Sequence, residues 1–252
     1  MPPTDIPFEP RFLHAGDTAL VVELGDRVDR RISARVLALG ARIDAARLPG
    51  VVETVPTFRS LMVHYDPLRT SFAQLKPQLE QMLGDLDVHQ RPGRLWTLPL
   101  CYEMPHAVDL ADVAQRLKLS PERVVALHAG TTFNVYMLGF LPGHPYLGDT
   151  PSALTLPRRE SPRVRVPAGS VAIAMNLCSI YPLDSPGGWH IIGRTPARIY
   201  DHRLEPPVYF APNDAIRFEP VSAARYDDLE QQGAAGTLVI SPRIAQDGEP
   251  AP

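Results

Sequence analysis

Hydrophobic and polar positions in the first third of the chain follow the periods of short strands and amphipathic helices. Apolar residues fill positions 19–24 except for Glu23, which predicts a short strand. Further along, apolar residues recur every three or four positions from Val28 to Ile43, which places them on one face of a helix. Pro49 and Gly50 interrupt this pattern and predict the end of the helical segment.

A hairpin and a second helix are expected next along the chain. The β-rich runs 51–55 and 61–65 flank a polar turn, so they can pair as a hairpin. Thr70 or Ser71 can cap a following helix, whose apolar residues again share one face. The order strand, helix, two strands, helix predicts a small α/β sandwich, which we assign to residues 8–88.

The second part of the chain has a different pattern, in which short β-rich runs alternate with prolines and glycines. The polar stretch 85–94 predicts a linker, and a strand is expected at 95–100. Helices are expected at 109–118 and directly after Ser120. Further short strands are predicted at 133–138, 164–166, 171–175 and 190–192. This pattern is typical of a closed or nearly closed β structure, which we assign to residues 95–240, and the whole chain is predicted to be α+β.

Composition removes several classes of function. The 252 residues carry 25 basic and 28 acidic side chains, so no broad basic face is expected for nucleic acid. No apolar run reaches the roughly 18 residues that a membrane-spanning helix needs. Cys101 and Cys178 stand far apart, without metal-ligand spacing around them. With no signal-peptide pattern at the start, these features predict a cytoplasmic protein without a metal site in this chain.

Motifs for common enzyme chemistries are missing from the sequence. It contains no GxxxxGK[ST] phosphate-binding loop, no GxGxxG dinucleotide motif, no HExxH metal motif and no GxSxG nucleophile elbow. The histidines are scattered, and such residues are more often structural than catalytic.

The segment 139–196 concentrates the unusual chemistry. It is rich in glycine and proline, and four arginines at 158, 159, 163 and 165 stand near a single acidic residue, Glu160. Exposed backbone N–H groups and guanidinium groups can hold a carboxylate or a phosphate, so the segment predicts a rigid anion-binding pocket. The alternative is that the glycines and prolines form tight turns and the arginines form structural ion pairs.

The same segment carries a family resemblance. It reads GFLPGHPYLG (139–148), PRR (157–159), PRVRVPAGSV (162–171), IYP (180–182), SPGGW (185–189) and IGRTP (192–196). In this order the motifs resemble the family that includes KipI, allophanate hydrolase subunit 1 and the B subunit of 5-oxoprolinase, and the resemblance extends over nearly the whole chain. It implies a small α+β domain followed by a cyclophilin-like β-barrel. It also implies ATP as cofactor of an assembled complex, a partner of the type of KipA or the C subunit of 5-oxoprolinase, and a third subunit of the LamB/YcsF type.

Two departures from the family pattern stand out. The family usually has an aromatic residue after the PG pair, where this chain has His144. The family commonly has Gly-x-Gln-Thr-Gly before IYP, where this chain has Met-Asn-Leu-Cys-Ser at 175–179. If that strand lines the pocket, its backbone freedom and its hydrogen-bonding groups are changed.

The leading hypothesis is a subunit of an ATP-dependent amide or lactam hydrolase that acts on 5-oxoproline. His144 is the candidate acid or base. The candidate substrate- or anion-binding residues are Arg194, Thr195, Ser170, Asn176, Arg158 and Arg159. The alternatives are a non-catalytic regulator that inhibits a sensor histidine kinase and a prolyl isomerase, the last suggested by the barrel resemblance alone.

Overall fold

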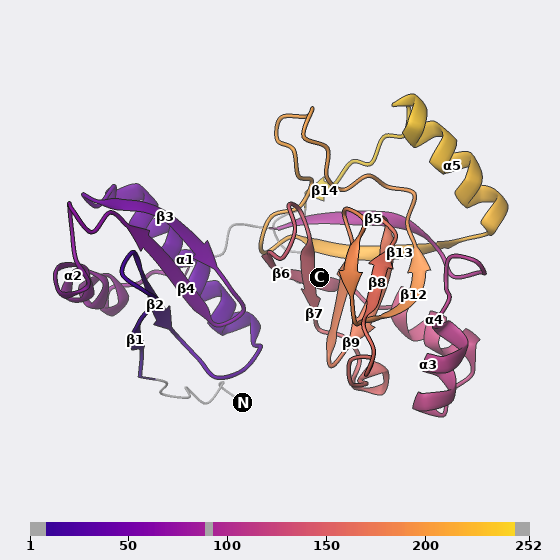
Figure 1. Ribbon diagram of the computed structural model, residues 1–252, viewed down its shortest axis with the longest axis horizontal. Helices are drawn as coiled ribbons and strands as arrows, with labels where there is room; N and C mark the ends of the chain where they lie inside the picture. Colours follow the sequence, from indigo (N-terminus) through magenta and orange to yellow (C-terminus); the bar gives the residue numbers. More distant parts are fainter. Residues whose placement is uncertain (1–8, 89–92, 245–252) are drawn as a thin grey trace. The chain divides into compact units, whose positions relative to one another are not determined.

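The computed structural model describes residues 9–88 and 93–244, and the chain divides into two compact units, Met1–Arg91 and Pro92–Pro252 (Figure 1). Each unit has its own hydrophobic core. No helix among the described residues is long and apolar enough to cross a membrane.

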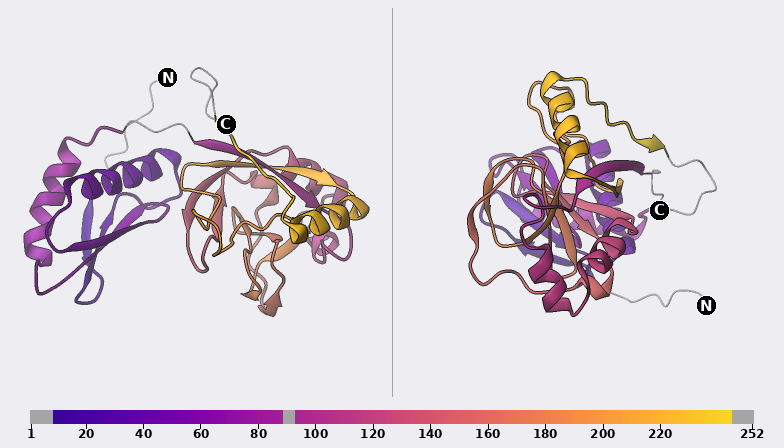
Figure 2. Two further views of the ribbon diagram at one scale, coloured as in Figure 1. Left: turned by 90° about the horizontal axis from the view of Figure 1, so that it is seen from above. Right: turned by 90° about the vertical axis from the view of Figure 1, so that its right-hand side faces the viewer.

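The N-terminal unit is a four-stranded antiparallel sheet covered by two helices. Its elements are β1 (Arg11–His14), β2 (Ala19–Glu23), α1 (Arg30–Ala46), β3 (Val51–Pro56), β4 (Ser60–Tyr65) and α2 (Phe72–Gly84). The strands lie in the order β1-β2-β4-β3, and both helices contribute to one core on one face of the sheet (Figure 2). The predicted hairpin is present as β3 paired with β4.

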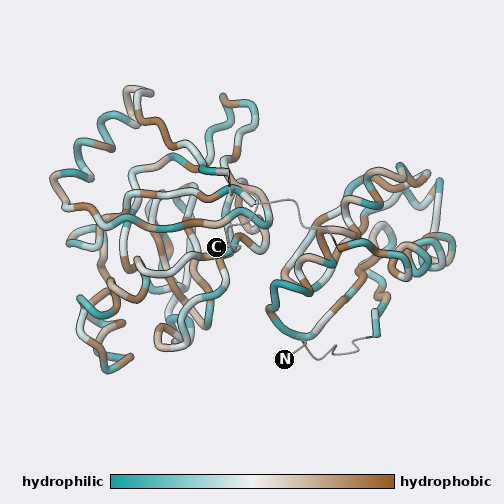
Figure 3. The backbone as a smooth tube through the Cα atoms, turned by 180° about the vertical axis from the view of Figure 1, so that it is seen from behind, coloured by the Kyte–Doolittle hydropathy of each residue, from teal (hydrophilic) through white to brown (hydrophobic). Residues whose placement is uncertain are grey.

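Local sequence signals account for these elements. The Asp29 side chain caps α1 by accepting a hydrogen bond from the Arg31 N–H, and Ser71 caps α2 through the Gln74 N–H. The apolar residues of α1 at positions 36, 39 and 43 are buried against the sheet, as their spacing predicts. Figure 3 shows hydrophobic and hydrophilic stretches alternating along the helices. The edge strand β1 has no such pattern, because three of its four residues are exposed.

The C-terminal unit contains a closed β-barrel. Its strands are β5 (Arg94–Cys101), β6 (Phe133–Leu138), β7 (Pro145–Gly148), β8 (Arg163–Val166), β9 (Ser170–Ala174), β10 (Leu177–Ile180), β11 (Ser185–Gly187), β12 (His190–Arg194), β13 (Ala215–Val221) and β14 (Arg243–Ile244). Neighbouring strands in the order β12-β9-β10-β7-β6-β13-β5 are hydrogen-bonded, and β12 also pairs with β5 to close the ring. The α+β class and the barrel that the family resemblance implies are therefore confirmed.

Helices and one extra ribbon complete the unit. Its helices are α3 (Leu110–Leu117), α4 (Pro121–Ala129), the short 3-10 helix η1 (Ser152–Leu154) and α5 (Ala223–Ala235). These helices lie outside the barrel (Figure 2), where contacts join α3 to β12, α4 to β13 and α5 to β5. Outside the barrel ring, β8 and β11 pair as a two-stranded ribbon. The expected linker, 85–94, includes residues 89–92, which lie outside the described residues, and the barrel begins with β5 at Arg94.

One buried carboxylate ties three segments of this unit together. Asp109, which precedes α3, is 4% exposed. Its Oδ1 accepts hydrogen bonds from Arg159 Nη1 at 3.1 Å and Arg163 Nη2 at 2.6 Å, and its Oδ2 accepts the Ile191 N–H at 2.7 Å. The carboxylate therefore fixes the loop before β8 and the backbone of β12 against the start of α3.

Replacing this carboxylate tests how much it contributes to the stability of the fold. Asp109→Asn keeps the size of the side chain but leaves two partly buried guanidinium groups without a counter-charge. We expect a loss of about 3 kcal/mol in the free energy of unfolding, measured by urea denaturation. The control is Asp112→Asn, which removes an exposed i,i+4 pair with Arg116 and should leave the free energy of unfolding nearly unchanged. Equal losses in the two variants would contradict the anchoring role of Asp109.

Candidate functional site

The motif-rich segment 139–196 contributes to two cavities in the C-terminal unit, and the two share no lining residue. The first, which we call the aromatic cavity, has a volume of about 280 Å³. Its lining residues are Phe140, His144, Tyr146, Arg158, Pro162, Tyr181, Pro186, Gly187, Gly188 and Trp189. The second, which we call the Arg194 cavity, has a volume of about 550 Å³. The sequence predicts one pocket here, whereas the fold places His144 and Arg158 at the first cavity and Arg194 and Thr195 at the second.

Aromatic rings surround His144 in the first cavity. Its imidazole centroid lies 5.1 Å from the Tyr181 ring at 89°, 5.0 Å from the Tyr146 ring and 5.5 Å from the Phe140 ring. The Trp189 indole continues this wall, 6.0 Å from the Tyr146 ring. Edge-to-face rings of this kind form a rigid apolar surface that suits a flat ligand.

A glycine makes the close packing of this wall possible. A Cβ atom on Gly187 would lie 2.5 Å from the Tyr181 hydroxyl, so a larger residue there would push the phenol ring away. Burial raises the pKa of Tyr181 to about 12, so its hydroxyl stays protonated at neutral pH and can donate a hydrogen bond.

His144 is a buried neutral base, and one of its two ring nitrogens has no hydrogen-bond partner among the described residues. It is 3% exposed, and its Nε2 lies 2.6 Å from the Ser179 hydroxyl. Burial lowers the pKa of His144 to about 4, so the ring is neutral at physiological pH. The buried Nδ1 has no hydrogen-bond partner among the described residues. A buried polar atom of this kind costs free energy until a partner binds it.

A second buried histidine, His128, lies in the barrel core and differs from His144 in its hydrogen bonds. His128 is fully buried, and both of its ring nitrogens have partners: the Tyr102 hydroxyl lies 2.7 Å from Nδ1, and Cys178 Sγ lies 3.4 Å from Nε2. His128 is thus a satisfied core residue, whereas His144 lines a cavity with spare hydrogen-bonding capacity. Cys178 is buried beside it, and burial raises the pKa of its thiol, which argues against a nucleophilic role.

The four arginines of the expected anion site point in different directions. Arg159 and Arg163 bind Asp109, and Arg165 binds the exposed Asp184. Arg158 makes no ion pair within the described residues, and its guanidinium lies 5.9 Å from the centroid of the Trp189 ring, at the aromatic cavity. Three of the four arginines thus form structural ion pairs, which was the alternative to an anion-binding role. Only Arg158 offers its charge to this cavity.

Two backbone contacts hold the segment that carries Arg158. The Arg159 N–H donates to the Gly188 carbonyl at 2.8 Å, and the His190 Nε2 lies 3.0 Å from the Pro157 carbonyl. With the Asp109 pairs, these contacts fix the chain on both sides of Arg158. Its backbone is therefore set before any ligand arrives, which lowers the entropic cost of binding.

Arg194 and Thr195 belong to the second cavity. The Arg194 Nε donates to the Ala168 carbonyl at 2.8 Å, and its guanidinium lies 5.9 Å from the Tyr226 ring centroid and 4.0 Å from Glu230. The Thr195 hydroxyl accepts the Ala197 N–H at 3.2 Å. These contacts join the barrel rim to α5, so Arg194 is already engaged by protein groups. Its anion-binding role stays a prediction.

Ser170 and Asn176 line neither of these two cavities. Ser170 is 1% exposed and pairs with Arg194 between β9 and β12. Asn176 is exposed in the turn that joins β9 to β10, next to Met175, which has φ of 56°. The fold does not bring either residue to the aromatic cavity with His144.

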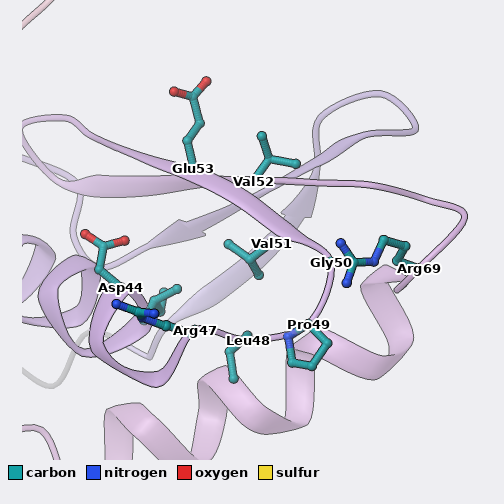
Figure 4. Close-up of a pocket in the computed structure, with 10 residues that line it drawn as sticks. Asp44, Arg47, Leu48, Pro49, Gly50, Val51, Val52, Glu53 and Arg69 are labelled. Carbon is teal, nitrogen blue, oxygen red and sulfur yellow. The ribbon is translucent and has the colours of Figure 1, made fainter.

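A third cavity, of about 380 Å³, lies in the N-terminal unit between the end of α1 and the start of β3 (Figure 4). All four of its charged side chains, Asp44, Arg47, Glu53 and Arg69, are exposed. Figure 4 shows Glu53 pointing away from Arg47 and Arg69. No cluster of metal-ligating side chains occurs among residues 9–88 and 93–244.

Comparison with known proteins now identifies the family. Residues 10–210 match the family model described as carboxyltransferase domain, subdomain C and D. The chain belongs to this family. It is 33% identical over 228 residues to the B subunit of 5-oxoprolinase from Bacillus subtilis (strain 168), covering 86% of this chain and 95% of the relative. The resemblance seen in the motifs is therefore confirmed, and the chain is related to subunits of enzyme systems.

Solved structures support the same assignment. The protein TTHA0988 aligns with a TM-score of 0.73 at 37% identity, covering 82% of this chain, and this chain spans 40% of that protein. The Kluyveromyces lactis urea amidolyase aligns with a TM-score of 0.79 at 19% identity, covering 94% of this chain and 16% of that protein. At that identity the second comparison shows a shared carboxyltransferase-domain fold.

The two departures from the family pattern meet at His144, which lines the aromatic cavity. His144 stands where the family usually has an aromatic residue, and Ser179 stands at the second glycine of the family run. Their side chains are hydrogen-bonded to each other. Ser179 was not among the residues expected from the sequence, and the simultaneous departure at both positions is the signal that could have linked them.

The neutral His144 should make stability depend on pH. Its pKa is about 4 in the folded chain against 6.5 for the unperturbed group, so the unfolded chain binds the extra proton first as the pH falls. The free energy of unfolding should therefore decrease between about pH 6.5 and pH 4, by as much as about 3 kcal/mol for this one group.

Urea denaturation of the wild-type chain and His144→Phe across this pH range checks the effect. His128, whose pKa burial lowers to about 3, titrates in both proteins and cancels in the difference. The variant should lose stability less steeply on acidification than the wild type. Parallel stability curves would mean that His144 is not buried as a neutral ring.

Proposed function

We propose that the chain is one subunit of an ATP-dependent 5-oxoprolinase, which opens the lactam of 5-oxoproline to give glutamate. The proposal rests above all on one observation: three relatives, each named as the B subunit of 5-oxoprolinase, are 33%, 35% and 39% identical to this chain. Its partners in the proposal are a protein of the type of KipA or the C subunit of 5-oxoprolinase, and a third subunit of the LamB/YcsF type.

The aromatic cavity is the proposed substrate site within this subunit. Its volume, about 280 Å³, lies just below the usual range for drug-sized ligands, which favours a smaller molecule. Arg158 provides a positive charge, and His144 provides a neutral polar edge between aromatic rings. A small lactam that carries a carboxylate matches this set of groups.

The two cavities near the motif segment do not fit ATP. The aromatic cavity is small and has one cationic side chain, whereas a triphosphate needs several positive charges or a phosphate-binding loop. The larger Arg194 cavity is lined by Arg194 and Arg198, but Arg194 already donates to the Ala168 carbonyl. The same cavity includes Glu230, whose carboxylate lies 4.0 Å from the Arg194 guanidinium and would repel phosphate. We therefore propose that ATP is held by a different subunit of the complex and supplies activation of the amide when it is bound.

The residues of this chain then bind and orient the substrate. Both cysteines are buried, and burial raises the pKa of each thiol, so neither is suited to attack an amide carbonyl. A neutral imidazole beside the lactam can accept or donate a hydrogen bond without carrying charge into an apolar cavity. Positioning of this kind accelerates a reaction without a covalent intermediate on the protein.

Co-expression with partner subunits of these two types tests this function. We expect a stable complex in gel filtration, with an interface above roughly 1,600 Å² in total, because the subunits must hold one site together. ATP hydrolysis by the complex should require 5-oxoproline, with glutamate formed in step with ADP.

The control is the same complex without this chain, in which the 5-oxoproline-dependent hydrolysis should be lost. Separate elution of the subunits at micromolar concentration would contradict the proposed assembly. A complex that forms but hydrolyses ATP equally with and without 5-oxoproline would contradict the proposed substrate.

A further inference from the structure

The aromatic cavity carries three features that protein stability alone does not account for. The first is the cation at its edge. The neighbouring arginines in the sequence are neutralised by Asp109 or Asp184, yet Arg158 makes no ion pair in the part of the chain that the structure describes. Its charge lies beside the Trp189 ring, at the cavity, where a planar carboxylate can accept two parallel hydrogen bonds from the guanidinium.

The second feature is the unpartnered Nδ1 of His144. Because Ser179 can either donate to Nε2 or accept from it, the imidazole can carry its single proton on either nitrogen. Nδ1 can therefore accept a hydrogen bond from an amide N–H or donate one to an amide carbonyl. A lactam presents both groups on one edge of a flat ring.

The third feature is the conformation of Phe140. Its φ of 72° lies in the left-handed region, which is unfavourable for a side chain of this size, and 62% of its surface is exposed. Gly139 precedes it directly, so a residue suited to such a backbone lies next to one that is not. The Phe140 ring stands edge-on to His144 and lines the cavity, so it can cover a bound ligand.

We propose that the aromatic cavity binds a small, flat carboxylate with an amide edge, in which Arg158 holds the carboxylate, His144 Nδ1 holds the amide and Phe140 covers the ring. This inference deepens the function proposed above, since it assigns the atoms with which this subunit recognises its substrate. The four aromatic rings of the wall contact the faces and edges of the ligand ring.

Three ring compounds test this recognition on the isolated full-length chain. 5-Oxoproline carries both the carboxylate and the lactam, 2-pyrrolidinone carries only the lactam, and cyclopentanecarboxylate carries only the carboxylate. Binding is followed by tryptophan fluorescence, because Trp189 lies in the cavity wall, and by saturation-transfer NMR of the ligand. 5-Oxoproline should bind at millimolar concentration, and each of the other compounds should bind more weakly.

Variants then assign each half of the ligand to one residue. Arg158→Gln should weaken 5-oxoproline binding roughly ten- to hundredfold, the usual effect of losing a hydrogen bond to a charged group, and should leave 2-pyrrolidinone binding unchanged. The matched control is Arg165→Gln, which removes an exposed arginine paired with Asp184 and should leave all three affinities unchanged.

His144→Phe should remove the difference in affinity between 5-oxoproline and cyclopentanecarboxylate, because the proposed hydrogen bond between the amide and Nδ1 is then lost. Phe140→Gly should raise the thermal midpoint, through relief of the left-handed strain, and should weaken all ring ligands alike. Circular dichroism spectra confirm that each variant is folded.

Several results would overturn the inference. Absence of 5-oxoproline binding to the folded chain would do so, as would equal binding of 5-oxoproline and 2-pyrrolidinone or an unchanged affinity in Arg158→Gln. The experiments distinguish a failure of the proposed enzyme function from a failure of the proposed ligand recognition. Selective binding by the chain, together with an inactive complex, would remove the proposed function and keep the cavity assignment. An active complex in which the isolated chain takes up no ligand would do the reverse.

Discussion

The carboxylate of Asp109 is the constraint on which the candidate site depends. It is buried, and it joins the start of α3, the backbone of β12 and two arginines, Arg159 in the loop before β8 and Arg163 at the start of β8. Because neither guanidinium can leave without exposing a buried negative charge to an apolar surrounding, the loop is held in one position. Arg158 lies within that loop, so the ion pairs of Asp109, which lie outside the cavity, fix the position of the guanidinium that the cavity contains.

The β-barrel positions the histidine and the aromatic rings of the aromatic cavity. Strand order brings β7 beside β10, so that residues far apart in sequence, His144 just before β7 and Ser179 in β10, form a hydrogen bond. The imidazole is then enclosed by rings from three different segments and loses its solvation, which keeps it neutral. The loops supply the groups, and the closed ring of strands holds them at hydrogen-bonding distance.

Local sequence patterns reveal neither which of the four arginines lacks an ion pair within the described residues nor that residues of α5 form a helix. Successive residues of an extended segment point to opposite sides, and the side that meets Asp109 depends on a residue some fifty positions earlier in the chain. Local pattern therefore shows a basic cluster but not which member is free. Likewise α5 buries only Tyr226 and Leu229, so it has little apolar periodicity by which sequence analysis could recognise it.

Local sequence patterns specify the α+β class, the paired strands β3 and β4, the caps of α2 and α4, and the motif segment from which the cavity is built. These features depend on residues within a few positions of one another, through side-chain periodicity and capping hydrogen bonds. Folding of the barrel, in contrast, brings Arg158 and His144 to one cavity and Arg194 and Thr195 to another. Ion pairing, desolvation and cavity shape depend on distances between remote segments, which closure of the barrel sets and no local pattern records.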